Sequence, residues 1–286
     1  MDIQVNGTTL FIDVEGARLR PDGGHLVGHP TVVALHGGPG FDQGYLRPGL
    51  APLANVAQVF FIDLRSQGRS ARAPIETCTV EQMAEDVEAV CDLLGLEPVV
   101  VLGHSAGGFV ALEFALRHPH RVSRLVLCDT AATLAPLPDE KPPPGLADRG
   151  TPQAVAAAGR LFGGDFSEES IAAFSELVAP FYAGPDHEDI PGQLLALSEL
   201  NGEVAADFFE HQAARYDLRA QLSHILAPAL VVVGSWDWVC PPAQSRVLAG
   251  GLPNAELVVI DGAGHFPFSE QPEEFLARVS PFLAGD

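Results

Sequence analysis

The chain has 286 residues, enough for one or two domains, and 47% of them are hydrophobic, which allows a large buried core. A formal net charge of −21 disfavours nucleic acid and anionic membrane surfaces as partners, because both repel an acidic protein. The sequence contains no run of about 18 apolar residues, so no membrane span is predicted. Since Met1–Leu10 lacks the features of a signal peptide and the four cysteines are scattered, we expect a cytoplasmic protein with reduced thiols.

The first part of the chain alternates between predicted strands and helices. A β-hairpin is expected around Asn6-Gly7, a dipeptide that favours two-residue turns. Helices are expected over Val80–Leu94, where Thr79 can cap the first turn, and over Ala106–Arg117. Four continuous apolar runs are typical of strands buried on both faces of a parallel sheet: Thr31–Leu35, Val59–Ile62, Val99–Leu102 and Arg124–Cys128. This alternation predicts a mostly parallel, doubly wound α/β sheet.

The alternation stops in the middle of the chain. Residues 135–150 are rich in proline, which excludes helix and central strand and predicts a linker. Residues 152–216 have helical patterns without strands. Strands then return at Ala229–Val233 and Glu256–Ile260, followed by a last helix over Pro272–Leu283. We therefore expect a core made of residues 1–134 and 219–286, with a helical cap, residues 135–218, inserted into it.

A Gly-x-Ser-x-Gly motif lies between the predicted strand Val99–Leu102 and the helix that follows it. The motif spans residues 103–107 and has Ser105 at its centre. Small neighbours let the strand and the helix approach at a strained turn, which exposes the serine hydroxyl at a helix N-terminus. Ser105 is therefore the predicted nucleophile.

A serine nucleophile needs a base and an acid that orients the base. His265 follows the predicted strand Glu256–Ile260 on a glycine-containing loop, and Asp237 follows the strand Ala229–Val233. The order Ser105, Asp237, His265 is the order expected when a strand–turn–helix elbow carries the serine. Asp129 and Asp261 are alternatives for the acid, because both also follow predicted strands.

A glycine-rich loop follows the first predicted core strand and reads His-Gly-Gly-Pro-Gly over residues 36–40. An acyl-transfer site needs two N–H donors for the developing oxyanion. One is the N–H of Ala106, directly after the serine, and the other is expected from Gly38, with Gly37 as the second choice. Pro39 has no N–H and cannot donate.

Aromatic side chains flank the predicted acid and base and recur in the predicted cap. We expect Trp236, Phe266, Phe208 and Phe209 to line the substrate pocket. The sequence has no phosphate-binding loop, dinucleotide fingerprint or His-Glu-x-x-His motif, so no metal or organic cofactor is expected.

The His-Gly-Gly-Pro-Gly stretch and the Asp-x-Arg-x-x-Gly-x-Ser turn at residues 63–70 resemble the signatures of proline iminopeptidases, a branch of the α/β hydrolases. The resemblance covers the whole chain and implies an α/β-hydrolase fold with an inserted helical cap. The elbow departs from the branch, which commonly has Gly-Gly-Ser-Trp-Gly. The branch also carries a cap glutamate that holds the substrate amine, and Ala205 stands at the matching position. Glu203, Asp207 and Glu210 are nearby carboxylates that could replace it.

Three functions remain open at this point. The first is a proline iminopeptidase-like serine hydrolase, acting on a short peptide or small amide through an acyl-enzyme. The second is a carboxylesterase or lactonase with an apolar acyl pocket. The third is a small-molecule binding module without turnover. A carboxylate that faces Ser105 from the cap would favour the peptidase, and a wholly apolar chamber would favour the esterase.

Overall fold

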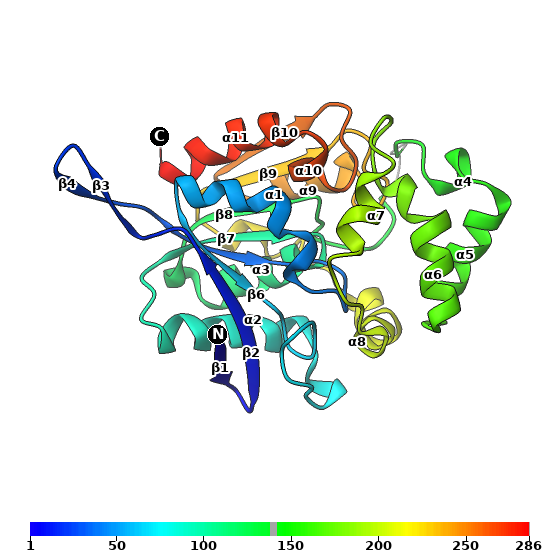
Figure 1. Cartoon of the computed structure of the whole chain (residues 1–286), viewed down its shortest axis with the longest axis horizontal. Helices are drawn as coiled ribbons and strands as arrows, with labels where there is room; N and C mark the ends of the chain where they lie inside the picture. Colours follow the sequence, from blue (N-terminus) through cyan, green and yellow to red (C-terminus); the bar gives the residue numbers. More distant parts are fainter. Residues whose placement is uncertain (138–141, 286) are drawn as a thin grey trace.

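A computed structural model describes residues 1–137 and 142–285 and contains an eight-stranded sheet with helices on both faces (Figure 1). The strand order is β1-β2-β6-β5-β7-β8-β9-β10. From β6 to β10 the pairs are parallel, and the first two pairs are antiparallel. The strands are β1 (Asp2–Val5), β2 (Thr8–Glu15), β5 (Thr31–Leu35), β6 (Gln58–Ile62), β7 (Val99–His104), β8 (Val122–Cys128), β9 (Ala229–Gly234) and β10 (Ala255–Ile260). The predicted α/β-hydrolase sheet is confirmed.

The N-terminal hairpin has the turn that its sequence predicts. Val5 pairs with Thr8, so Asn6 and Gly7 form a two-residue turn. Both have positive φ angles, 44° and 76°, which asparagine and glycine adopt more readily than other residues.

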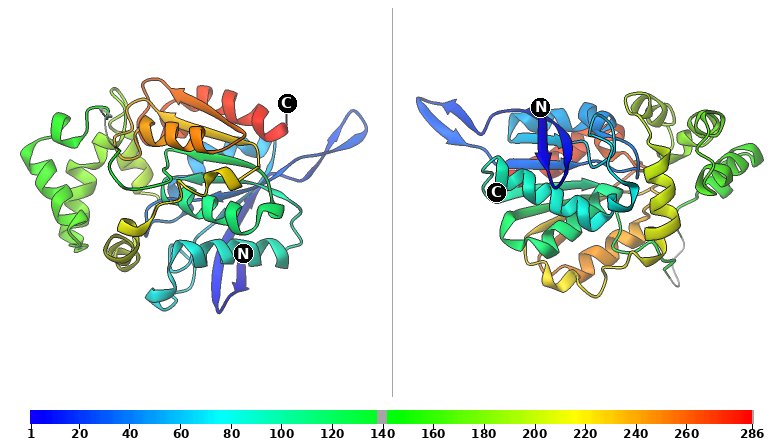
Figure 2. Two further views of the ribbon diagram at one scale, coloured as in Figure 1. Left: turned by 180° about the vertical axis from the view of Figure 1, so that it is seen from behind. Right: turned by 90° about the horizontal axis from the view of Figure 1, so that it is seen from below.

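Two groups of helices cover the sheet. On one face, α2 (Val80–Leu93), α3 (Ala106–Arg117) and α9 (Pro242–Gly251) pack on the odd-numbered valines and leucines of the central strands. On the other face, α1 (Arg47–Leu50) and α11 (Pro272–Ala284) cover the even-numbered ones (Figure 2). The predicted cap of α2 is present, because Thr79 Oγ1 accepts the N–H of Gln82 at 3.1 Å. Helix α9 was not predicted, because its apolar residues are too few for a clear helical pattern.

A second hairpin, absent from the sequence-based prediction, projects from one end of the molecule (Figure 1). It consists of β3 (Leu19–Asp22) and β4 (His25–Gly28), which are largely exposed. Asp22 pairs with His25, so the turn is Gly23-Gly24, another two-residue turn with positive φ angles. The turn signal was in the sequence, but exposed strands lack the apolar run that identified the core strands.

Between β8 and β9 the chain forms a helical segment, residues 142–215, at the end of the molecule opposite the β3–β4 hairpin (Figures 1 and 2). Its α-helices are α4 (Leu146–Arg149), α5 (Pro152–Phe162), α6 (Glu168–Leu177), α7 (Ile190–Leu195) and α8 (Gly202–Asp207). The prediction of a helix-free linker over residues 135–150 is wrong at α4. Prolines exclude a helix only near themselves, and this single turn starts after the last of them. Part of the predicted linker, residues 138–141, lies outside the described residues.

Across residues 1–137 and 142–285, no helix has the length and apolar character needed to cross a membrane.

Candidate active site

Ser105 lies at a sharp turn between β7 and α3, with φ 51° and ψ −124°. The strand and helix meet closely on either side of it. A Cβ added to Gly103 would lie 2.5 Å from the carbonyl oxygen of Gly107, and one added to Gly107 would lie 2.2 Å from that of Leu35. Residues larger than glycine would collide with the backbone at both positions, so the motif is required by the turn that presents Ser105.

Asp237 contacts His265 through a fully buried hydrogen bond. Nδ1 of His265 lies 2.9 Å from Oδ2 of Asp237. The other carboxylate oxygen, Oδ1, accepts the backbone N–H groups of Val239 at 2.8 Å and Cys240 at 3.1 Å. The two amides therefore fix the rotation of the carboxylate, with one oxygen facing the imidazole. His265 and Ser105 line the same cavity.

The two other candidate acids have different partners. Asp129 is fully buried and accepts the N–H of Gly234 at 2.9 Å. Its pKa is raised well above the usual carboxyl value, first by burial and then by the charge of Asp237. Asp261 is exposed and accepts the hydroxyl of Ser235 at 3.2 Å. Of the three aspartates, Asp237 is the one whose carboxylate meets His265.

The glycine-rich loop after β5 passes directly beside the serine. A Cβ added to Gly37 would lie 2.6 Å from Cβ of Ser105. The N–H of Gly37 donates to Oη of Tyr45 at 2.6 Å, so it is already used inside the protein. Gly38 lines the cavity that holds Ser105, and Ala106 begins α3, whose first amides have no partner within the helix. This leaves Gly38 and Ala106 as the better pair of candidate oxyanion donors.

Glu270 is a buried residue of this site that the sequence analysis missed. It lies in the short helix α10 (Pro267–Glu270), and its carboxylate accepts three backbone N–H groups. Those of Gly264 and Phe266, on either side of His265, lie at 2.7 and 2.9 Å, and that of Gly184 in the helical segment lies at 2.8 Å. Burial raises the pKa of Glu270, while the three N–H groups act in the opposite direction. The signal in the sequence was an acidic residue within the apolar stretch after His265.

A cavity of about 370 Å³ lies between the loops at the carboxyl ends of the strands and the helical segment. The core contributes Phe41, Tyr45 and Phe266 to its wall, beside Ser105 and His265. The helical segment contributes mainly aromatic and aliphatic side chains, among them Phe162, Phe166, Phe174, Tyr182, Leu195 and Phe209. No Asp, Glu, Lys or Arg is among the described residues that line it.

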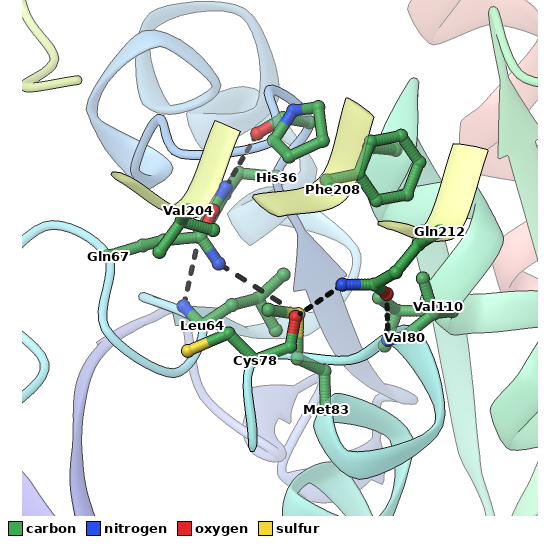
Figure 3. A pocket seen from close by; sticks show the side chains of 13 residues that line it. His36, Leu64, Gln67, Cys78, Val80, Met83, Val110, Val204, Phe208 and Gln212 are labelled. Carbon is green, nitrogen blue, oxygen red and sulfur yellow. Dashed lines mark hydrogen bonds between the residues drawn. The ribbon is translucent and has the colours of Figure 1, made fainter. Parts of the chain in front are cut away.

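Two of the four residues predicted to line the pocket do so, namely Phe266 and Phe209. Phe208 instead faces a smaller, adjoining cavity of about 20 Å³ (Figure 3). Its ring packs on that of Phe109. Phe208 and Phe209 are successive residues of a helical turn, and their side chains point in different directions. Trp236 is not among the residues that line the large cavity. The centre of its ring lies 5.4 Å from Cζ of Arg149, whose guanidinium packs on it.

The position where the resemblance implies an amine-binding glutamate is occupied by Ala205, which is buried and lines the large cavity. The neighbouring carboxylates do not take its place. Glu203 and Glu210 are exposed, and the Asp207 carboxylate accepts the side-chain amide of Gln212 at 3.0 Å. None of the three lines the cavity.

The turn at residues 63–70 packs inside the core and has internal partners for its charges. Arg65 forms a buried ion pair with Asp86 at 2.6 Å. Asp63 accepts the backbone N–H groups of Gln43 at 3.1 Å and Arg69 at 2.9 Å. The turn is also bonded to the glycine-rich loop, because the N–H of Gly40 donates to Oε1 of Gln67 at 2.7 Å and the N–H of Leu64 donates to Nε2 of His36 at 3.0 Å.

A cluster of possible metal ligands coincides with the candidate acid–base pair. Side-chain atoms of Asp237, Cys240 and His265 lie within 4.8 Å of one another. Metal binding by cysteine requires the thiolate, and burial raises the pKa of the Cys240 thiol well above its usual value. Asp237 and His265 are already bonded to each other. The donor set therefore fits a metal poorly.

A family model described as the alpha/beta hydrolase fold matches residues 30–272 of the chain. The chain belongs to the α/β-hydrolase fold family. It is 26% identical over 285 residues to the proline iminopeptidase PfmaB of Pestalotiopsis fici, covering 96% of this chain and 98% of that protein. The resemblance to proline iminopeptidases drawn from the sequence is thus confirmed.

Other similar proteins of this α/β-hydrolase family are named for esters and lactones. A pimeloyl-(acyl-carrier protein) methyl ester esterase of Neisseria meningitidis serogroup C is 33% identical over 204 residues, which are 70% of this chain and 76% of that protein. The crystal structure of the enol-lactonase from Burkholderia xenovorans LB400 superposes with a TM-score of 0.76 at 28% identity, covering 99% of each chain. Family membership therefore supports hydrolase activity and leaves the substrate open.

Proposed function

We propose that this α/β hydrolase is a serine carboxylesterase or lactonase that acts on small, uncharged substrates with an apolar acyl group. The observation that carries the proposal is the lining of the 370 Å³ cavity around Ser105, which is mainly aromatic and aliphatic and includes no Asp, Glu, Lys or Arg among the described residues. A charged substrate group would lose its hydration there without gaining a partner, and an uncharged acyl group would not.

In the proposed mechanism, Ser105 attacks the carbonyl carbon while Nε2 of His265 takes the hydroxyl proton. Asp237 holds the other ring nitrogen through the 2.9 Å bond and stabilises the imidazolium that forms. The N–H groups of Gly38 and Ala106 bind the oxyanion. His265 then gives its proton to the departing alcohol, or to the alcohol end of an opened lactone, and water releases the acid by the same route.

We further propose that residues 135–218 act as a cap that selects the substrate, on a core of residues 1–134 and 219–286. The helical segment supplies many of the aromatic residues that line the cavity, including Phe162, Phe174 and Phe209. Bonds such as Asn201 N–H to the Gly40 carbonyl, 2.8 Å, hold the segment against the glycine-rich loop. The size of the acyl group should therefore depend on this segment.

A proline iminopeptidase-like activity is the second candidate. The full-length similarity to a proline iminopeptidase favours it. Recognition of a free α-amino group needs a carboxylate, and Ala205 fills the position where the family resemblance implies one. Because Ala205 provides no carboxylate, the esterase or lactonase is the better candidate.

Parallel rates on proline p-nitroanilide, on p-nitrophenyl esters of increasing chain length and on a small lactone test the proposal. We expect ester or lactone turnover that far exceeds anilide turnover and is lost in Ser105→Ala. Two further variants probe the cavity: Ala205→Glu adds a carboxylate, and Ala205→Gln adds the same volume without charge. Ala205→Glu should lower kcat/KM for esters more than Ala205→Gln does. Dominant anilide turnover by the wild-type protein would instead establish the peptidase.

A further inference from the structure

Two buried side chains, Tyr45 and His104, link the loops that carry the proposed catalytic groups. Tyr45 follows the glycine-rich loop, and His104 directly precedes Ser105 at the end of β7. They are 3% and 1% exposed, and both line the cavity beside Ser105. The mechanism proposed above gives neither of them a role.

Three hydrogen bonds connect these side chains in series. The N–H of Gly37 lies 2.6 Å from Oη of Tyr45, and this oxygen lies 2.7 Å from Nδ1 of His104. On the other side of the ring, Nε2 of His104 lies 2.7 Å from the backbone carbonyl oxygen of His265. The series therefore runs from the glycine-rich loop through the elbow to the loop of the proposed base.

The two ends of the series determine the direction of its first and last bonds. A backbone N–H can only donate and a carbonyl oxygen can only accept. Nε2 of His104 must therefore carry a proton, which it donates to the carbonyl of His265. Oη of Tyr45 accepts from Gly37, and it donates its own proton to Nδ1 when that nitrogen carries none. This requires the neutral Nε2–H form of His104.

The electrostatic surroundings favour this neutral form. Burial lowers the pKa of His104 well below its usual value, and the nearby His265 and His36 rings lower it further. The bond to the backbone carbonyl of His265 acts in the opposite direction. Burial also raises the pKa of Tyr45, so its hydroxyl remains protonated and able to donate.

We propose that Tyr45 and His104 are positioning residues, which hold the oxyanion loop, the elbow and the His265 loop at fixed distances through this one-way series of hydrogen bonds. The proposal rests on the proposed function, because it assigns the residues to the transition state of acyl transfer. Gly37, at one end of the series, directly precedes Gly38, the proposed oxyanion donor. A shift of Gly37 would therefore also move the N–H of Gly38. Displacements of about 1 Å in an active site can cost on the order of 100-fold in rate.

Substitutions at both residues test the proposal kinetically. His104→Leu removes both ring nitrogens, whereas His104→Gln keeps an acceptor and a donor with nearly the spacing of the two ring nitrogens. We expect His104→Leu and Tyr45→Phe each to lower kcat about 10- to 100-fold with KM changed about twofold or less. His104→Gln should rescue most of the loss seen in His104→Leu. The double variant Tyr45→Phe/His104→Leu should cost about as much as either single change, because both break one series.

Two measurements keep the proposal falsifiable if a variant folds poorly. Thermal unfolding identifies such a variant, and ¹⁵N NMR of the histidine side chains in the wild-type protein reads the form of His104 directly. The neutral Nε2–H form is expected, and an Nδ1–H or doubly protonated ring would overturn the proposal. So would a folded His104→Leu protein with wild-type kcat, or equal losses in His104→Gln and His104→Leu. A wild-type protein that turns over no ester would refute the proposed function, while the NMR result would still test the hydrogen-bond series.

Discussion

Replacing Asp237 by asparagine should abolish most of the activity while leaving the shape of the site intact. The reason lies in the two backbone N–H groups, from Val239 and Cys240, that donate to Oδ1 of Asp237. In Asp237→Asn these donors require an oxygen at the same place. The amide nitrogen must then face Nδ1 of His265, where the carboxylate oxygen Oδ2 stood at 2.9 Å.

This exchange reverses the hydrogen bond to the imidazole. The new NH₂ group donates to Nδ1, so the neutral ring must carry its proton on Nε2 instead. Nε2 is the nitrogen proposed to accept the proton of Ser105, and it can no longer do so. An asparagine in the equivalent role of a serine protease triad lowers kcat about 10⁴-fold, which corresponds to about 5 kcal/mol of transition-state stabilisation. KM should change little, because Asp237 is fully buried and does not line the cavity.

Steady-state kinetics on a p-nitrophenyl ester measures this effect, and Asp129→Asn is the matched control. The raised pKa of Asp129 favours its neutral form, which asparagine imitates in shape and polarity. We expect Asp129→Asn to keep kcat within about fivefold of the wild type. An Asp237→Asn protein with kcat within about tenfold of the wild type would refute the reasoning, and so would a loss in kcat of more than about fivefold in Asp129→Asn.

Three further predictions concern stability and substrate size. Because the pKa of Asp129 is raised in the folded protein, its protonated carboxyl stabilises the fold fully below the usual carboxyl pKa, and this stabilisation is lost as pH rises toward the raised pKa. Asparagine does not titrate. The melting temperature of Asp129→Asn should therefore rise relative to that of the wild type from about pH 5 to about pH 8. Glu270→Gln leaves at least one of three buried N–H groups without an acceptor, so denaturant unfolding should reveal a loss of about 1–3 kcal/mol, with a lower kcat because two of these groups flank His265. Phe174→Ala enlarges the cavity and should move the preferred acyl chain to a longer ester in a chain-length series, with a stability loss of about 3–5 kcal/mol.

Each of these predictions has a contradicting result. A melting-temperature difference for Asp129→Asn that stays constant or falls with pH would contradict the first. Glu273→Gln, at an exposed position of α11, is the control for Glu270→Gln, and equal effects of the two would contradict the second. An unchanged chain-length preference in Phe174→Ala would contradict the third.

The fold could be predicted where burial leaves a clear pattern. Strands such as Val99–Leu102 are buried on both faces, and a continuous apolar run identifies them. The hairpin β3–β4 is exposed and has no such run, so only its Gly-Gly turn indicated it. Helix α4 was excluded because three prolines precede it, yet nothing in its own sequence opposes a helical turn.

The contact between Asp237 and His265 could be predicted because strand order brings the carboxyl ends of β9 and β10 together, with the two residues on the loops that follow. The sequence could not predict that Phe209 lines the large cavity and Phe208 does not, because it does not say which of two adjacent aromatic residues faces the cavity. Glu270 and Tyr45 were missed for a related reason. Glu270 contacts the backbone of Gly184, and Tyr45 contacts the ring of His104, which are 86 and 59 residues away along the chain. No spacing in the sequence records such contacts.

The central claim is that Ser105 is a nucleophile activated by His265 and Asp237. Peptide mass spectrometry after reaction with a fluorophosphonate tests it most directly, because this reagent bonds covalently to an activated serine hydroxyl. The account predicts rapid labelling of Ser105, none in Ser105→Ala, and strongly slowed labelling of Ser105 in Asp237→Asn. A folded wild-type protein that stays unlabelled, or a label that persists on another residue in Ser105→Ala, would contradict it.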